Sequence, residues 1–215
     1  MVDDSYDKQV EEVRRLITRL EGISLKVVIK VLSGYEIKDF NKDDPSDKAL
    51  LNCLISALNS VMDSINKEGI KAKRPNEAGN KIEKYVKDEL NKLGCTAETP
   101  QTKTGKRKSS GYPDIVFKDL SGRINYLECK TFNKKDLNSS LRTFYLSPSK
   151  DFKVITSAHH FLVSFEMVQK QKSFYVKGFK LLTLEKLTVN VKNEFNASNR
   201  ELYKPSNILY ELSKD

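Results

Sequence analysis

The chain has 215 residues, of which 38% are hydrophobic and 31% are charged. This length and composition predict a soluble globular protein with one domain, or with one domain and a helical extension. No apolar run approaches the roughly 20 residues that a membrane span needs, and the acidic first residues lack the apolar core of a signal peptide. The sequence therefore excludes a membrane-spanning helix, and we expect no membrane partner.

The net charge and the cysteines indicate the class of binding partner and the cellular compartment. Lys and Arg number 38 against 29 Asp and Glu, which gives a formal net charge of +9. Such a surplus favours polyanionic partners such as nucleic acid, although a generally lysine-rich proteome would produce it too. Cys53, Cys95 and Cys129 are odd in number and widely spaced, which argues against a disulfide framework and against a zinc site. We therefore expect a cytoplasmic protein.

The first third of the chain has mainly helical spacing. Apolar residues recur every three to four positions in residues 7–20 and again in residues 49–65, which predicts two amphipathic helices. The apolar and β-branched residues 25–32 suit either a helix or a strand. We expect residues 1–70 to form a helical region that packs on a core of residues 71–215.

The next part begins with a helix and continues with short extended segments. Asn76 is a suitable N-cap for a helix over residues 76–93, and Gly94 is a suitable stop. Residues 112–117 and 124–131 are the clearest strands of the chain, and a turn-like segment joins them. We therefore expect these two strands to form a hairpin.

Further strands are expected on either side of this hairpin. Residues 96–99 form a possible first strand, and residues 133–146 have a mixed, partly helical pattern. Three more strands are expected at residues 154–166, 174–184 and 187–195. The whole pattern indicates an α/β fold in which a sheet of about five strands is flanked by helices.

Two of the expected strands carry charged residues in apolar surroundings. Asp114 lies at the start of one, and Glu128 and Lys130 lie near the end of the other. Side chains alternate along a strand, so Glu128 and Lys130 point to the same face. If the strands pair, Asp114 approaches both, and two carboxylates can then hold Mg²⁺ together with water and a substrate phosphate. The ion would activate water for attack on phosphorus, and Lys130 would orient that water or stabilise the developing charge.

Glu128 and Lys130 could also be an ordinary exposed pair of surface charges, because such a pair would have the same sequence. The pattern acid-any-Lys occurs three times, at residues 36–38, 128–130 and 151–153, so the triplet alone is weak evidence. Its context is more specific, because the only Pro-Asp of the chain, at residues 113–114, precedes the middle triplet by the length of a short hairpin. Both segments also lie in hydrophobic strand sequence, which favours the middle triplet as the functional one.

The Tyr-Pro-Asp-Ile-Val segment at residues 112–116 and the Leu-Glu-Cys-Lys-Thr segment at residues 127–131 resemble the PD-(D/E)xK nuclease superfamily. In size and style the chain resembles the type II restriction endonucleases of that superfamily, and the likeness in motif covers roughly residues 76–131. The resemblance implies a restriction-endonuclease-like mixed central sheet with the two acids on a β-hairpin.

Carried over residue by residue, the resemblance makes Asp114 and Glu128 the metal ligands and catalytic acids, and Lys130 the motif lysine. It implies double-stranded DNA as the substrate and Mg²⁺ as the cofactor. It also implies a homodimer that reads a palindromic site, since two-fold protein symmetry matches two-fold DNA symmetry.

Many members of that superfamily also carry a catalytic glutamate on the helix before the first core strands. Glu77, at the start of the helix over residues 76–93, is the first choice for this position, and Glu83 is the second. Glu77 also has a simpler explanation, because a carboxylate in the first turn of a helix is stabilised by the helix dipole.

A basic loop leads into the Asp114 strand. Residues 101–110 contain no acid and hold four positive side chains, those of Lys103, Lys106, Arg107 and Lys108. Such a loop beside a phosphodiester-cleaving site is well placed to bind DNA phosphates, although loops of this composition are often only solvated. Three later residues either extend this predicted DNA-binding surface or are ordinary surface charges: Lys134, Lys135 and Arg142.

The remaining features indicate no second chemistry. Adjacent histidines on a strand point to opposite faces, so we interpret His159 and His160 as structural. The chain contains no GxxxxGK[ST] phosphate loop, so we expect no nucleotide cofactor. We predict a Mg²⁺-dependent type II site-specific endonuclease. A repair or junction-resolving nuclease of the same superfamily and a catalytically inactive nucleic-acid-binding module are the alternatives.

Overall fold

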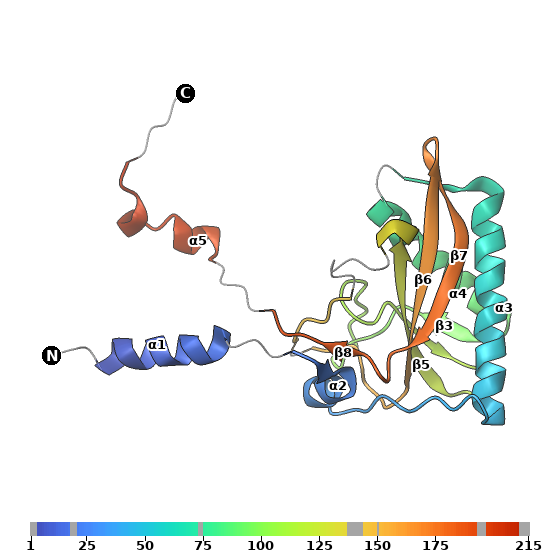
Figure 1. Cartoon of the computed structure of the whole chain (residues 1–215), viewed down its shortest axis with the longest axis horizontal. Coiled ribbons are helices and arrows are strands. Elements are labelled where there is room, and N and C mark those ends of the chain that lie inside the picture. The colour runs from blue at the N-terminus through green and yellow to red at the C-terminus, as the bar shows by residue number, and fades with distance from the viewer. Residues whose placement is uncertain are drawn as a thin grey trace. The chain divides into compact units, whose positions relative to one another are not determined.

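The computed structural model describes residues 4–17, 21–72, 75–136, 144–149, 151–192 and 197–210. Contacts divide the chain into two compact units, one of Ser24–Thr188 and the other of Met1–Ile23 together with Val189–Asp215. The first unit contains the main sheet and the predicted motif (Figure 1). Within the described part of the chain, no helix is both long and apolar enough to cross a membrane.

The larger unit has three helices in its described residues, α2 (Leu25–Ser33), α3 (Pro45–Glu68) and α4 (Pro75–Lys92). The segment after residue 24, which suited either a helix or a strand, is thus helical. The two later helices are confirmed. Helix α3 extends beyond both ends of the predicted range 49–65, and α4 agrees with the predicted range 76–93 to within one residue at each end. Their apolar stripes are continuous over several turns, which is why the sequence pattern was sufficient to find them.

The ends of α3 show why this helix has its length. The Asp44 carboxylate caps the N-terminus by accepting hydrogen bonds from the backbone N–H groups of Ser46 and Asp47, at 2.9 and 3.0 Å. The chain leaves the helix at Gly69, whose φ is +71°. A Cβ atom there would lie 2.8 Å from the Tyr175 ring, so the turn into the sheet requires glycine.

The main sheet has six strands in the order β2-β7-β6-β5-β4-β3. Their bounds are β2 (Ile70–Lys71), β3 (Thr96–Glu98), β4 (Ile115–Lys118), β5 (Ile124–Phe132), β6 (His159–Lys170) and β7 (Ser173–Thr183). The sheet is mixed, because β5 and β6 are parallel and the other neighbours are antiparallel. The predicted α/β class and mixed sheet are confirmed, and β2 is the strand that the sequence pattern missed, since two residues show no periodicity.

The β4–β5 hairpin is formed as predicted, with Ile115 opposite Leu127. Its turn is fixed by Arg123, whose guanidinium group bonds the carboxylates of Asp119 at 2.8 Å and Asp47 at 2.7 Å. Asp47 belongs to the first turn of α3, so these ion pairs attach the end of the hairpin to that helix. Removal of one partner from such a part-buried network typically costs a few kcal/mol.

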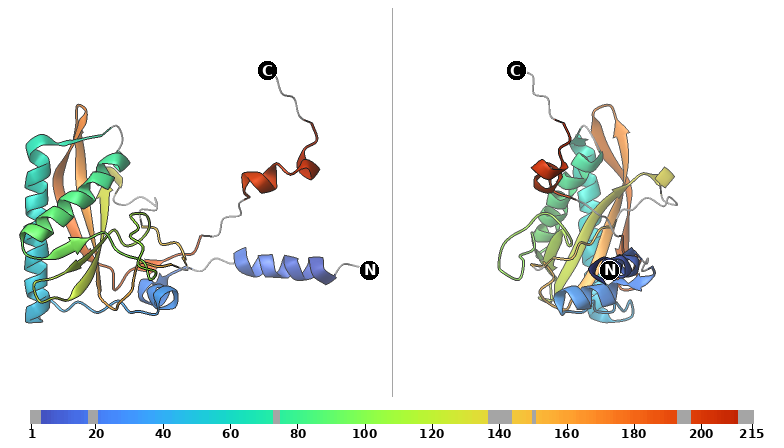
Figure 2. Two further views of the ribbon diagram at one scale, coloured as in Figure 1. Left: turned by 180° about the vertical axis from the view of Figure 1, so that it is seen from behind. Right: turned by 90° about the vertical axis from the view of Figure 1, so that its left-hand side faces the viewer.

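Helices α3 and α4 cover one face of the sheet (Figure 2). Leu54 and Leu58 of α3 and Ile82 of α4 are completely buried in the resulting core, together with Leu127 of β5. Each such side chain contributes roughly 1.5–3 kcal/mol through its removal from water. This layer of apolar residues holds α4 against β3 and β5, and it thereby places α4 beside the predicted motif.

The later strands differ from the predicted ones at their ends. The strand expected at residues 154–166 begins at His159 and continues to Lys170. Of the strand expected at residues 187–195, the described residues up to 192 contain only β8 (Thr188–Val189), which pairs with β1 (Ile23–Ser24) in a separate two-stranded sheet. Residues 193–195 of this segment lie outside the described residues, as do residues 137–143 of the partly helical segment expected at residues 133–146.

The smaller unit contains α1 (Asp4–Ile17), α5 (Asn199–Leu202) and the 3-10 turn η2 (Pro205–Asn207). The helix predicted at residues 7–20 corresponds to α1. Helix α3 belongs to the same compact unit as the sheet, and the proposed division of the chain at residue 70 stays a prediction.

Candidate active site

The Asp114 side chain is held at the start of the hairpin. Asp114 directly precedes β4, and its Oδ2 accepts a hydrogen bond of 2.9 Å from the backbone N–H of Cys129 on β5. This bond ties the carboxylate to the neighbouring strand one residue after Glu128. The hairpin register therefore brings Asp114 and Glu128 together, as the sequence predicted.

Glu128 and Lys130 form a close ion pair on β5. Their side chains approach to 2.6 Å between Lys130 Nζ and Glu128 Oε1, which follows from strand alternation because both point to the same face. Glu128 is only 3% exposed. Its second oxygen, Oε2, is buried and has no hydrogen-bond partner among the described residues. One buried carboxylate oxygen thus lacks a hydrogen-bond donor among the described residues and is available to a cation.

The charges of this group are strongly coupled. Burial, and after it the negative charge of Asp114, raises the pKa of Glu128 to about 7, and the nearby Lys130 only partly opposes this shift. Burial alone would lower the pKa of Lys130, but the charge and hydrogen bond of Glu128, together with the negative charge of Asp114, outweigh burial and raise the pKa. The ammonium group therefore stays charged at neutral pH, whereas Glu128 is only partly ionised there because its pKa is raised.

The structure places the two candidate glutamates of α4 differently. Glu83 lies half-buried near Asp114, and burial followed by repulsion from Asp114 raises its pKa. Glu77 lies exposed in the first turn of α4 and does not line the cleft beside Asp114. Glu83, the second choice from the sequence, is therefore the one that the fold brings to the other acids. The spacing of the α4 stripe already put both on the helix, but only the crossing of α4 over β5 distinguishes them.

An open cleft of about 460 Å³ leads to these groups. It lies between α4, the segment before β4 and the end of β5. Glu128 is not among its lining residues and is buried beside it. The residues that line the cleft are Gly79, Asn80, Glu83, Ser109, Ser110, Gly111, Asp114, Cys129, Lys130, Thr131 and Tyr145.

The basic loop borders this cleft. Its residues Ser109 and Ser110 are in the cleft lining, directly after the positive side chains. Lys103, Lys106 and Lys108 are exposed. Arg107 is also exposed but is engaged in an ion pair of 2.6 Å with Glu98 on β3. The loop thus presents lysine charge next to the acids, which is the placement that the sequence predicted for it.

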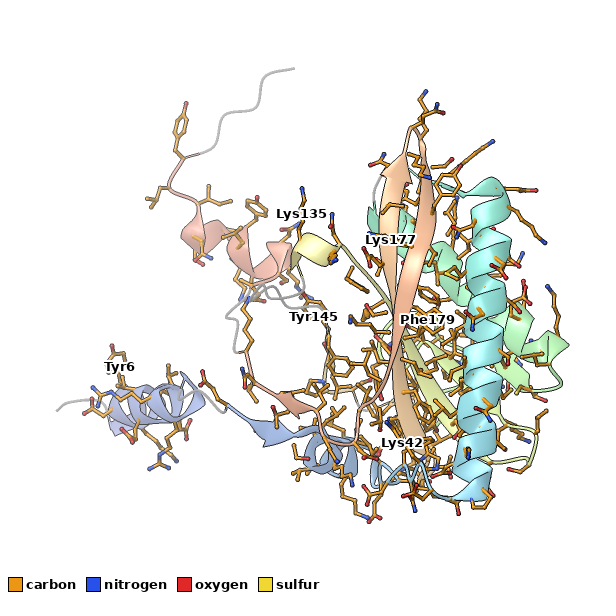
Figure 3. The ribbon with its side chains drawn as sticks, turned by 45° about the vertical axis from the view of Figure 1, so that its right-hand side comes forward. Tyr6, Lys42, Lys135, Tyr145, Lys177 and Phe179 are labelled. Atoms are coloured by element: carbon orange, nitrogen blue, oxygen red, sulfur yellow. The ribbon has the colours of Figure 1, made fainter. Side chains whose placement is uncertain are left out.

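The other predicted DNA-binding residues follow β5. Lys134 and Lys135 are exposed in the short 3-10 turn η1 (Lys134–Asp136). Figure 3 shows Lys135 on this turn and also labels Tyr145, which lines the cleft. Arg142 lies outside the described residues.

The histidines occupy opposite faces of β6, as expected. His160 is fully buried and bonds the Tyr112 hydroxyl at 2.5 Å through Nδ1. His159 instead lies 3.4 Å from an Asp47 carboxylate oxygen on the other side. Neither reaches the acidic group, and both help to attach β6 to its surroundings.

The donor set fits a hard divalent cation. In the described parts of the chain, no three His, Cys, Asp or Glu side chains are arranged to hold a metal ion by themselves. Mg²⁺ does not need such a cage, because it binds through one or two carboxylates and completes its shell with water and phosphate. The Oε2 atom of Glu128, for which the described residues provide no partner, is consistent with that kind of ligand set beside Asp114.

A mixed sheet that brings two carboxylates and an ammonium group together beside an open cleft and a basic loop defines a candidate phosphodiester-cleaving nuclease. Sequence comparison establishes the family: residues 19–206 match the type II restriction enzyme MjaV family, and the chain belongs to it. The chain is 47% identical to the type II restriction enzyme MjaV of Methanocaldococcus jannaschii, in an alignment that covers 98% of each protein. It is therefore a type II restriction enzyme, a site-specific DNA endonuclease, which confirms the predicted class over the repair-nuclease alternative.

Proposed function

We propose that this endonuclease hydrolyses phosphodiester bonds of double-stranded DNA with Mg²⁺ held by Asp114 and Glu128. The observation that carries the proposal is the buried Glu128 carboxylate, which has one oxygen without a hydrogen-bond partner in the described part of the chain and a second acid beside it. A divalent cation would supply the positive charge that this group lacks. When bound, Mg²⁺ polarises the phosphoryl group and lowers the pKa of a coordinated water.

The residues of the chain have distinct parts in this proposal. Asp114 is oriented by the Cys129 N–H group, so its carboxylate keeps a constant direction on the hairpin. Lys130, fixed by its ion pair with Glu128, orients the attacking water or stabilises the charge that builds on the phosphate oxygens. Glu83 is the favoured auxiliary acid because it lines the cleft, and Glu77 stays the alternative.

DNA contact is assigned to the lysines around the cleft. Lys103, Lys106 and Lys108 on the loop would bind backbone phosphates, and the turn with Lys134 and Lys135 would extend this surface. Arg107 would have to exchange Glu98 for a phosphate, so we give it a smaller share of the binding energy. A homodimer that matches the two-fold symmetry of a palindromic site, and a cytoplasmic location, complete the proposal.

Asp114→Ala tests the metal site. We expect the variant to lose cleavage of plasmid DNA in Mg²⁺ by at least about 100-fold, since loss even of outer-shell partners of a metal costs 10- to 100-fold. Calorimetry should show loss of Mg²⁺ binding, while DNA binding in EDTA should be retained. Asp39→Ala is the matched control, because Asp39 is an exposed acid paired with Lys26 away from the cleft. Wild-type cleavage by Asp114→Ala would remove Asp114 from the mechanism.

A further inference from the structure

Lys153 is a buried lysine that the proposed mechanism does not use. It is only 2% exposed, and its neighbours in the sequence, Phe152 and Val154, are also buried. Lysines are almost never buried to this degree unless their ammonium group has partners. The surroundings of the Lys153 amine therefore indicate why the chain keeps a charge there.

The amine of Lys153 is bonded to the basic loop and interacts electrostatically with the acidic group. Its Nζ donates a hydrogen bond of 3.3 Å to the backbone carbonyl of Lys108. Burial lowers the pKa of Lys153, and the negative charges of Asp114, Glu128 and Glu83 oppose that shift. These three acids are the ones gathered at the candidate metal site, so Lys153 supplies them with positive charge in addition to Lys130.

The segment that carries Lys153 is joined to the basic loop at two further points. The Asp151 carboxylate accepts hydrogen bonds from Thr104, at 3.1 Å from its backbone N–H and 2.8 Å from its hydroxyl. The backbone N–H of Lys103 donates to the carbonyl of Phe152 at 3.2 Å. The Lys153–Lys108 bond is the third attachment and the one next to Ser109 and Ser110 of the cleft lining.

We propose that Lys153 is a positioning residue that holds the basic loop of residues 101–110 against the acidic cleft. The electrostatic attraction of the three carboxylates keeps the amine in place, and the hydrogen bond to Lys108 transmits that position to the loop. The distance between the phosphate-binding lysines of the loop and the acids of the cleft then stays constant. The inference rests on the proposed function for its purpose, whereas the attachment itself rests on the hydrogen bonds between the two segments.

The test uses Lys153→Met, which removes the charge and the donor but keeps much of the side-chain volume. Lys153→Arg keeps both the charge and a donor, and Lys177→Met controls for loss of a lysine elsewhere, since Lys177 pairs with Glu166 on the β6–β7 hairpin. Figure 3 shows Lys177 on β7, which is separated from β4 by β6 and β5 in the sheet. Folding of each variant is checked by circular dichroism.

The first measurement is trypsin cleavage at Lys103, Lys106, Arg107 and Lys108 in EDTA without DNA. We expect Lys153→Met to be cut in this loop about tenfold faster, because loss of one net hydrogen bond shifts a local equilibrium by about that factor. Lys153→Arg and Lys177→Met should be cut at the wild-type rate. Equal protection of the loop in folded Lys153→Met would overturn the proposal. If that variant does not fold, Lys153→Gln, which keeps a neutral donor, is tested in the same way, and it should be cut at an intermediate rate.

The second measurement is the cleavage kinetics of the same variants with plasmid DNA. Displacement of the loop should raise KM and lower kcat together, by about tenfold in kcat, and Lys153→Arg should recover most of both. A merely structural lysine would lower stability without this rescue. Asp114→Ala separates the two hypotheses: its full activity would refute the metal site while leaving the loop result intact, and unchanged loop protection in Lys153→Met would refute only the role of Lys153.

Discussion

Glu128→Gln gives the sharpest physical prediction, because it removes the buried charge and leaves the shape of the side chain. Burial and Asp114 raise the pKa of Glu128 to about 7 from an ordinary value of 4.5. The folded protein thus binds this proton more tightly than the unfolded chain does. Stability is therefore favoured at low pH and is lost as pH rises from 4.5 through about 7.

The magnitude follows from these two pKa values. A tenfold difference in proton affinity between the folded and unfolded states corresponds to about 1.4 kcal/mol, so the stability contributed by protonated Glu128 falls by about 2–3 kcal/mol between pH 5 and pH 8. Glu128→Gln lacks this dependence, so its stability relative to wild type should rise by that amount over the same range. For a domain of this size, the change corresponds to a relative rise in Tm of roughly 5–10 °C.

Thermal and urea unfolding at pH 5 and pH 8 in EDTA would measure this difference. Glu166→Gln is the matched control, since Glu166 is a strand glutamate that pairs with Lys177 outside the cleft. Mg²⁺ should stabilise wild type at pH 8, as a ligand that binds only the folded state does, and should not stabilise Glu128→Gln. If the stabilities of the wild-type protein and of Glu128→Gln changed with pH in parallel, burial and Asp114 would not raise the pKa of this carboxylate as inferred.

Three further predictions concern the cleft, the loop and the fold. Glu83→Gln should lower kcat for plasmid cleavage by at least about tenfold, whereas Glu77→Gln should stay within about twofold; the reverse order would restore Glu77 as the auxiliary acid. Charge reversal of Lys106 and Lys108 should weaken DNA binding and reduce the slope of log K against log salt by about one for each phosphate that the loop no longer neutralises, and an unchanged slope would remove the loop from the DNA interface. Arg123→Met should cost about 2–3 kcal/mol in urea unfolding, because it takes the guanidinium group away from the buried carboxylates of Asp47 and Asp119; a decrease of less than about 0.5 kcal/mol would show that this network does not hold the hairpin on α3.

The local parts of the site were accessible from the sequence because they depend on short-range geometry. Asp114 and Glu128 lie on two strands joined by a tight turn, and strand alternation places Lys130 on the same face as Glu128. The long apolar stripes of α3 and α4 could likewise be recognised in the sequence. In each case the residues concerned are near one another in the chain, so the local sequence pattern was sufficient to predict how they lie.

Other features depended on contacts between distant segments. The choice of Glu83 over Glu77 follows from how α4 crosses β5. β2 is only two residues long and exists because β7 pairs with it. Lys153 was visible only as the third acid-any-Lys triplet, in a segment without periodicity, and its meaning depends on burial and on Lys108, 45 residues away.

The amino-acid sequence alone thus determined the α/β class, the hairpin and the chemical identity of its three central side chains. Short-range steric rules and hydrophobic periodicity act before any long-range contact is known. The tertiary structure decided which additional charges surround those side chains and how much water they lose. Burial and charge–charge interaction depend on where distant segments come together, and these two quantities set the pKa of Glu128 and the environment of Lys153.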